Sequence, residues 1–68
     1  MKENQIGKLL EERGETIQRL ADSMGKTYPG IHRLVRKKDI SKVTLETLTL
    51  VAEFLNVSVE DLYIKKND

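Results

Sequence analysis

Apolar positions follow a helical period between residues 17 and 36, in two blocks separated by a short break. In the first block, Leu20, Ala21 and Met24 are spaced so that they share one face of a helix. Ala21 is the only small residue of that face, and it lets a second helix cross at close range. Gly25 follows, where a helix commonly ends on a left-handed residue. The first block therefore predicts a short helix that begins at Thr16, a suitable N-cap, and ends at Gly25.

The second block predicts another short helix directly after this turn. Ile31, Leu34 and Val35 are spaced i, i+3 and i+4 and define its apolar face. Thr27 is a suitable N-cap, and Pro29 lies in the first turn, where its missing N–H costs little. Two short helices joined by a tight turn are typical of a helix-turn-helix, whose second helix can enter the major groove of DNA.

One helix is predicted before this pair, over about residues 4–13. Ile6, Leu9 and Leu10 form its inward-facing stripe, and Gly14 ends it. Its charged residues lie on the opposite face, as expected for a helix that packs on a small core.

The C-terminal third predicts two more helices after an irregular basic loop at residues 37–43. The first begins at Thr44 and ends at Asn56, and its inward-facing stripe consists of Leu45, Leu48, Val51, Ala52 and Leu55. Ser58 caps a final short helix, with Asp61 three residues later as its capping-box partner. No segment has the period-two pattern of a strand beyond a residue or two. The predicted fold class is therefore all-α, with five short helices.

The length of 68 residues predicts one domain, residues 1–68, with the helix-turn-helix at about 16–37 and the C-terminal helices at about 44–64. The chain has no cysteine, which excludes disulfides and thiolate metal ligands. No apolar run is long enough for a signal peptide or a membrane span, so we expect a cytoplasmic protein without a membrane partner.

The net charge is only +1, which by itself argues against a nucleic-acid partner. Its distribution argues the other way. Residues 26–42 carry six basic side chains and one acidic one, whereas residues 44–64 carry four acidic side chains and no basic one. A basic segment beside an acidic segment predicts a molecule with two electrostatic faces. The blander alternative is chance clustering, because 34% of the residues are charged.

Several positions carry a family resemblance: Leu20-Ala21, Met24-Gly25, Ile31, Leu34, Leu45-Glu46-Thr47-Leu48, Val51-Ala52, Leu55-Asn56-Val57-Ser58 and Leu62. In this order and spacing the chain resembles the Cro and lambda-repressor type of helix-turn-helix domain, the XRE family, over about residues 4–62. The resemblance implies a compact five-helix lambda-repressor-like domain that binds double-stranded DNA sequence-specifically. It further implies a small prokaryotic or phage transcription regulator, a repressor that acts as a homodimer on an inverted repeat in the nucleoid.

The same resemblance implies which residues face DNA. They lie on the second helix of the helix-turn-helix, in the loop after it and at the start of the first helix: Gln18, Thr27, Tyr28, Pro29, His32, Arg33, Arg36, Lys37, Lys38 and Lys42. Lys26 departs from the family pattern, which has an apolar residue in the turn, so the turn is looser or Lys26 points to phosphate. Residues 28–30 also depart from it, so known sequence preferences do not transfer.

Several of these residues also have an interpretation without DNA. Arg33 is the best choice for base readout, since an arginine can bind guanine O6 and N7 together, but it can also contact phosphate or solvent. Tyr28 can contact phosphate or a thymine methyl group, or pack locally. Pro29 can simply start its helix, and residues 36–38 suit the C-terminal helix dipole. His32 can donate to a base or phosphate, and a lone histidine is a poor metal site.

The dimer interface is expected near the C-terminus, as the resemblance implies. Leu50 and Phe54 lie off the main stripe of their helix. Together with residues of the last predicted helix they form the candidate set: Leu50, Phe54, Val59, Tyr63 and Ile64. The alternative is ordinary packing within one chain.

A second class of function stays open, namely a protein-interaction module, such as an antitoxin-like partner or antirepressor, that uses the apolar surface of the last two helices. An enzyme is not expected, because the chain has no catalytic Ser/His/Asp or Cys/His set and no glycine-rich phosphate loop. We expect no cofactor, no metal and no small-molecule ligand.

Overall fold

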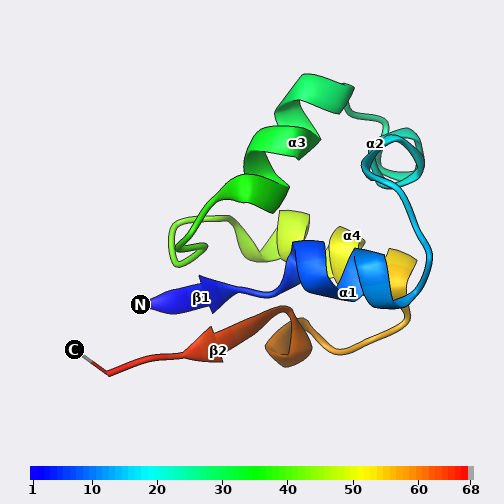
Figure 1. Ribbon diagram of the computed structural model, residues 1–68. Coiled ribbons are helices and arrows are strands. Elements are labelled where there is room, and N and C mark those ends of the chain that lie inside the picture. The colour runs from blue at the N-terminus through cyan, green and yellow to red at the C-terminus, as the bar shows by residue number, and fades with distance from the viewer. Residues whose placement is uncertain (68) are drawn as a thin grey trace.

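The computed structural model describes residues 1–67. Its α-helices are α1 (Ile6–Glu12), α2 (Ile17–Met24), α3 (Tyr28–Arg36) and α4 (Leu45–Leu55). A single turn of 3₁₀ helix, η1 (Val59–Leu62), follows α4. Two short strands, β1 (Lys2–Asn4) and β2 (Tyr63–Lys65), complete the fold at the two ends of the chain (Figure 1).

The two strands pair antiparallel and bring the chain termini together. Glu3 lies opposite Ile64 in this register. Beyond the strands, the N–H of Lys66 donates to the carbonyl oxygen of Met1 at 2.9 Å. The other side of β1 is also paired, because Glu3 forms an isolated antiparallel bridge with Asp39, in the segment after α3. β1 therefore lies between β2 and the segment that follows α3.

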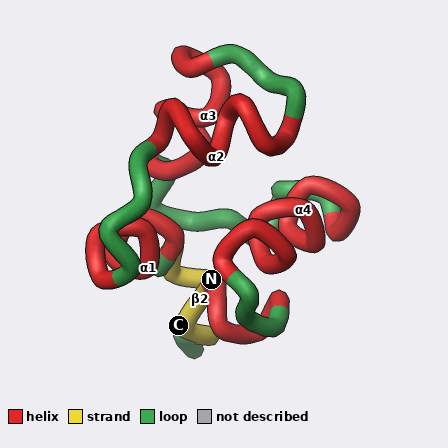
Figure 2. Tube along the Cα trace, turned by 90° about the vertical axis from the view of Figure 1, so that its right-hand side faces the viewer, coloured by secondary structure: helices red, strands yellow, loops and turns green. Residues whose placement is uncertain are grey.

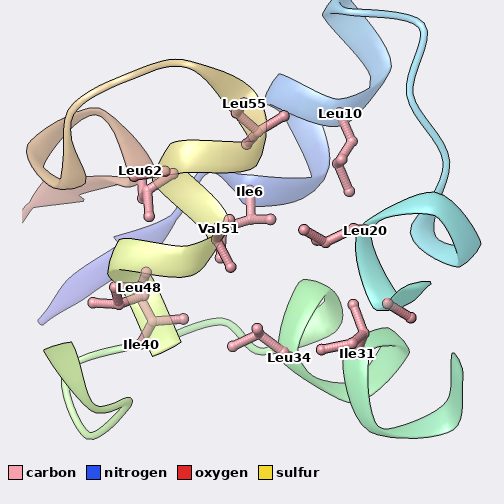
Figure 3. Close-up of a cluster of buried hydrophobic side chains, with 12 residues drawn as sticks. Ile6, Leu10, Leu20, Ile31, Leu34, Ile40, Leu48, Val51, Leu55 and Leu62 are labelled. Atoms are coloured by element: carbon pink, nitrogen blue, oxygen red, sulfur yellow. The ribbon is translucent and has the colours of Figure 1, made fainter. Parts of the chain in front are cut away.

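The core is one apolar cluster to which every helix contributes (Figure 3). Its fully buried large side chains are Ile6, Leu20, Ile40, Val51 and Leu62. No polar or charged residue is buried among residues 1–67. Burial of apolar side chains is the dominant favourable term for such a small fold.

The predicted helix caps are confirmed. The hydroxyl oxygens of Thr16, Thr27 and Thr44 each accept an N–H from the first turn of α2, α3 and α4. Gly25 ends α2 with φ +67° and Asn56 ends α4 with φ +56°, both left-handed. Caps of this kind are local chemistry, which explains why the sequence pattern located these helix ends correctly.

The prediction of a fifth α-helix and of no strands is wrong. Residues 59–62 form only one 3₁₀ turn, capped as expected by Ser58 and Asp61, and residues 63–65 are extended. The strands are three residues long, so neither can display a period-two pattern. They are stabilised by pairing between opposite ends of the chain, which local sequence does not reveal.

Three further details differ from the sequence prediction. α1 begins at Ile6 rather than near residue 4, because Asn4 belongs to β1. Leu45 was expected to face inward but is 70% exposed, since it is the first residue of α4 and lies beyond the core. Ile40 was placed in an irregular basic loop but is fully buried and anchors that loop to the core.

Candidate nucleic-acid interface

The helix-turn-helix consists of α2 and α3, which lie together at one end of the molecule with α1 and α4 below them (Figures 1 and 2). α2 buries Leu20 and Ala21, and α3 buries Ile31 and Leu34. Ala21 has no exposed surface, as expected for a small residue at a helix crossing. With its inner face occupied in this way, α3 presents the opposite face to solvent.

The turn between the two helices is tight. After the left-handed Gly25, the N–H of Lys26 donates to the carbonyl oxygen of Ala21 at 2.9 Å. The turn is therefore not loosened by Lys26, whose side chain is exposed. A surface hollow beside this turn is lined by both helix-turn-helix elements and the start of α4, including Met24, Ile31 and Thr47.

The outer face of α3 gathers polar and cationic side chains. Thr27, Tyr28, Pro29, Arg33 and Arg36 are exposed and His32 is half-buried. A second surface hollow runs along this face, and its lining residues are Gly30, His32, Arg33, Leu34, Arg36 and Lys37. The residues expected to face DNA on this helix thus share one solvent-facing surface.

Tyr28 and His32 interact with each other on this surface. Their rings are stacked, with centroids 5.8 Å apart and an angle of 26° between the ring planes. Tyr28 remains 42% exposed. This stacked pair, the Tyr28–His32 shelf, lies at the start of α3, where its exposed surface can contact bases or sugar.

The loop after α3 is basic and well anchored. Lys37, Lys38 and Lys42 are exposed, while Ile40 between them is buried. The N–H of Ile40 donates to the carbonyl oxygen of Lys2 at 3.0 Å, which attaches the loop to β1. Three lysines of the predicted interface therefore extend from a loop whose backbone has a defined position.

Asp39 is the only acidic residue of this loop, and its carboxylate is engaged in local hydrogen bonds. Its Oδ1 accepts from the Ser41 hydroxyl at 2.6 Å, from the Ser41 N–H at 3.0 Å and from the Lys2 N–H at 3.0 Å. These bonds, the Ser41 hydroxyl first, lower the pKa of Asp39 from its usual 3.8 to about 2. Asp39 is therefore an ionised organiser of the loop at neutral pH.

Gln18 lies in the first turn of α2 and is exposed. Its Nε2 donates to Asp22 Oδ1 at 2.8 Å, one helical turn later. A phosphate contact would require this amide to turn away from Asp22 or to use its free oxygen. Of the expected DNA-facing residues, Gln18 is the only one bonded to an acidic side chain within residues 1–67.

Sequence reasoning missed the residues that hold this surface in place, namely Asn4, Asp39, Ile40 and Ser41. Asn4 bonds to the end of α3 from a position about 30 residues earlier in the chain. The signal available for Asp39 and Ser41 was the spacing of an aspartate two residues before a serine, which is typical of an Asx turn. For Asn4 no local signal pointed to α3.

The candidate dimer residues fall into two groups. Leu50 and Ile64 are 37% and 48% exposed. Phe54, Val59 and Tyr63 are half-buried and pack against the core of their own chain. Lys2 also covers Tyr63, with its Nζ 4.8 Å from the ring centroid.

Among residues 1–67, no group of three or more histidine, aspartate or glutamate side chains is placed to hold a metal ion. Over the same residues, the helices are too short and too polar for any of them to cross a membrane.

Comparison with known families agrees with this geometry. Residues 5–68 match the model of the Cro/C1-type HTH DNA-binding domain. The chain belongs to this family. The family is named for DNA binding, and the match to the Cro/C1-type HTH model spans both α2 and α3.

One solved structure is similar to this Cro/C1-type domain along nearly its whole length. It is the crystal structure of a candidate DNA-binding protein from Bacteroides fragilis, with a TM-score of 0.81 and 36% sequence identity. The match covers 94% of this chain and 100% of that protein. Among curated proteins, no sequence matches this chain.

Proposed function

We propose that this protein is a sequence-specific transcription regulator, a repressor that binds an inverted repeat in double-stranded DNA as a homodimer. It would act on the nucleoid, in the cytoplasm. One observation carries the proposal: the outer face of α3 and the loop after it present five exposed basic side chains, at residues 33, 36, 37, 38 and 42. The only acidic residue among them, Asp39, is bonded internally.

In this proposal the residues of α3 and those of the loop after it have different roles. Arg33 reads a base, because an exposed arginine on a recognition helix can donate two hydrogen bonds to guanine O6 and N7. The Tyr28–His32 shelf contacts a sugar or a thymine methyl group next to it. Lys37, Lys38 and Lys42 neutralise phosphates, which contributes affinity without sequence information.

A homodimer would give the protein two recognition helices for two half-sites about one helical turn apart. Leu50 and Ile64 support this part of the proposal, because they remain exposed on the monomer. A repressor acting through promoter occlusion needs only this: a DNA-binding surface and a second copy.

Two substitutions separate base readout from phosphate contact. We expect Arg33→Ala to relax the preference at one base position, at a cost of about 1–3 kcal/mol in discrimination. We expect Lys38→Ala to weaken binding to all sequences alike and to reduce the slope of log K against log salt by about 0.9. Fluorescence anisotropy with labelled duplexes of varied sequence, repeated over a range of salt, measures both quantities.

The same titration tests the proposal as a whole. Strong binding that falls steeply with salt is the expected result for the wild type. An unchanged base preference in Arg33→Ala would refute the role of that residue. Little or no salt-dependent DNA affinity in the folded wild type would overturn the proposal in favour of a protein-interaction module.

A further inference from the structure

The last turn of α3 is closed differently from those of the other α-helices. α1, α2 and α4 are each followed by a left-handed residue: Gly14, Gly25 and Asn56. The next N–H then donates to a carbonyl five residues back, in the pairs Glu15–Leu10, Lys26–Ala21 and Val57–Ala52, at 2.9, 2.9 and 3.0 Å. Such local closure satisfies carbonyl groups that a helix end otherwise leaves without a partner.

α3 has no such closure, because Lys37 after it is extended, with φ −62° and ψ 139°. One local bond remains, from the Lys37 N–H to the carbonyl oxygen of Leu34 at 3.3 Å, and the other bonds to its terminal carbonyls come from Asn4, which lies in β1. The Nδ2 of Asn4 donates to the carbonyl oxygens of Leu34 at 2.9 Å and Val35 at 3.2 Å. The same Nδ2 donates to the carbonyl oxygen of Lys37 at 2.8 Å. Its two protons therefore serve three acceptors, so at least one proton is shared.

The backbone of Asn4 extends this attachment into the basic loop. Its N–H donates to the carbonyl oxygen of Lys38 at 3.1 Å. The peptide units of Lys37 and Lys38 are thus both held by one residue from the N-terminal strand. The side chains of these two lysines remain exposed.

Only a short side-chain amide can make this set of bonds. While Nδ2 faces the end of α3, the Oδ1 of Asn4 accepts the N–H of Ile6 at 2.9 Å, at the start of α1. An aspartate at this position could still accept from Ile6 but would bring a second acceptor to carbonyl oxygens. An alanine could neither accept the N–H of Ile6 nor donate to the carbonyl oxygens at the end of α3. The residue therefore links α1, β1 and the end of α3 through one planar group.

We propose that Asn4 is a positioning residue for DNA binding, which fixes the last turn of α3 and places Lys37 and Lys38 against phosphate. Asn4 itself touches no DNA in this account. The inference rests on the proposed function, because it takes the two lysines to be phosphate contacts. It adds that their placement is imposed from the N-terminal strand rather than from the recognition helix itself.

The test is the salt dependence of duplex binding by Asn4→Ala, measured by fluorescence anisotropy with a labelled duplex of mixed sequence. Asn4→Ala keeps the backbone N–H that bonds to Lys38, so the contact expected to be lost is that of Lys37. The slope of log K against log salt then becomes less steep by about 0.9, and affinity at about 0.1 M salt falls roughly eightfold. A merely structural role would lower the folded fraction equally at all salt concentrations and leave the slope unchanged. Ser58→Ala is the matched control, since it weakens the cap of η1 without contacting α3.

A double-mutant cycle makes the assignment specific. In a Lys37→Ala/Lys38→Ala background the contacts are already absent, so adding Asn4→Ala should leave the slope unchanged. A wild-type salt slope in Asn4→Ala would overturn the inference, and so would an equal further reduction of the slope in the Lys37→Ala/Lys38→Ala background. Either result would leave the proposed function intact. A wild type without salt-dependent binding would instead refute the proposed function.

Asn4→Ser is the second variant, because its hydroxyl can still accept from Ile6 but cannot serve three carbonyls. We expect the same flattened slope from it as from Asn4→Ala. If circular dichroism shows that both variants are unfolded, the residue has no separable positioning role and the inference is also overturned.

Discussion

α2 and α3 form the helix-turn-helix together, but they depend on different parts of the chain. α2 begins at the Thr16 cap and ends at Gly25, so both of its ends are closed by neighbours in sequence. α3 begins at the Thr27 cap, but at its other end a single local bond from the Lys37 N–H is joined by the three carbonyl bonds of Asn4. The helix that supports the interface is therefore self-contained, whereas the helix that forms it is attached to the N-terminal strand.

This difference has a consequence for function. β1 also pairs with β2 and with the segment at Asp39, so the chain termini and the basic loop share one strand. Any change that detaches β1 should disturb the DNA-facing loop before it disturbs α2. Local stability in small domains is commonly divided into such units.

The largest effect is expected when the remote closure of α3 is broken by Asn4→Asp. A carboxylate would face the carbonyl oxygens of residues 34, 35 and 37, and the lost bonds to partly buried groups should cost about 2–3 kcal/mol of unfolding free energy. Chemical denaturation followed by circular dichroism measures the change in the free energy of unfolding. Glu3→Gln loses an ion pair with Lys66 and keeps an amide oxygen that can accept from Gln5 Nε2, so it serves as the control and should change stability by less than about 1 kcal/mol. Equal stability of Asn4→Asp and wild type would contradict the remote closure.

A smaller effect is expected when the local closure of α2 is broken by Gly25→Ala. The added Cβ would meet no atom within 4 Å, so the cost is conformational and arises from φ +67°. A left-handed alanine costs about 1–2 kcal/mol. Thermal or denaturant unfolding gives the value, with Ser23→Ala, an exposed position inside α2, as the neutral comparison. A loss similar to that of Ser23→Ala would show that the turn can end α2 without a left-handed residue.

The smallest effect concerns the acid sensitivity of the basic loop. The pKa of Asp39 is lowered to about 2, so its stabilising contribution is fully present above about pH 4 and is lost as the pH falls towards 2. The free energy of unfolding of the wild type should therefore fall more between pH 4 and 2 than that of Asp39→Asn. Parallel curves for the two proteins over this range would refute the role of the carboxylate.

Sequence and structure agree best where the deciding contacts are local. Thr16, Gly25 and Thr27 each act on residues within a few positions, and the helices they bound were located correctly. The exposed outer face of α3 follows from the same reasoning, because burying residues 31 and 34 leaves the cationic positions outside.

The disagreements arise where the partner is distant. The strands exist because residues 2–4 meet residues 63–65, and Ile40 is buried because its loop is bonded to β1. Leu45 follows the apolar period of α4 but lies at the helix end, where no other element covers it. A periodic pattern gives the direction of a side chain and not what lies opposite it.

The most direct test of DNA reading by α3 is the selection of bound sequences from a random duplex library at moderate salt. The account predicts enrichment of an inverted repeat with half-sites about ten base pairs apart, one for each recognition helix of a dimer. Enrichment of a single half-site would support DNA recognition and contradict the homodimer. No enrichment by the folded, helical protein would contradict the account.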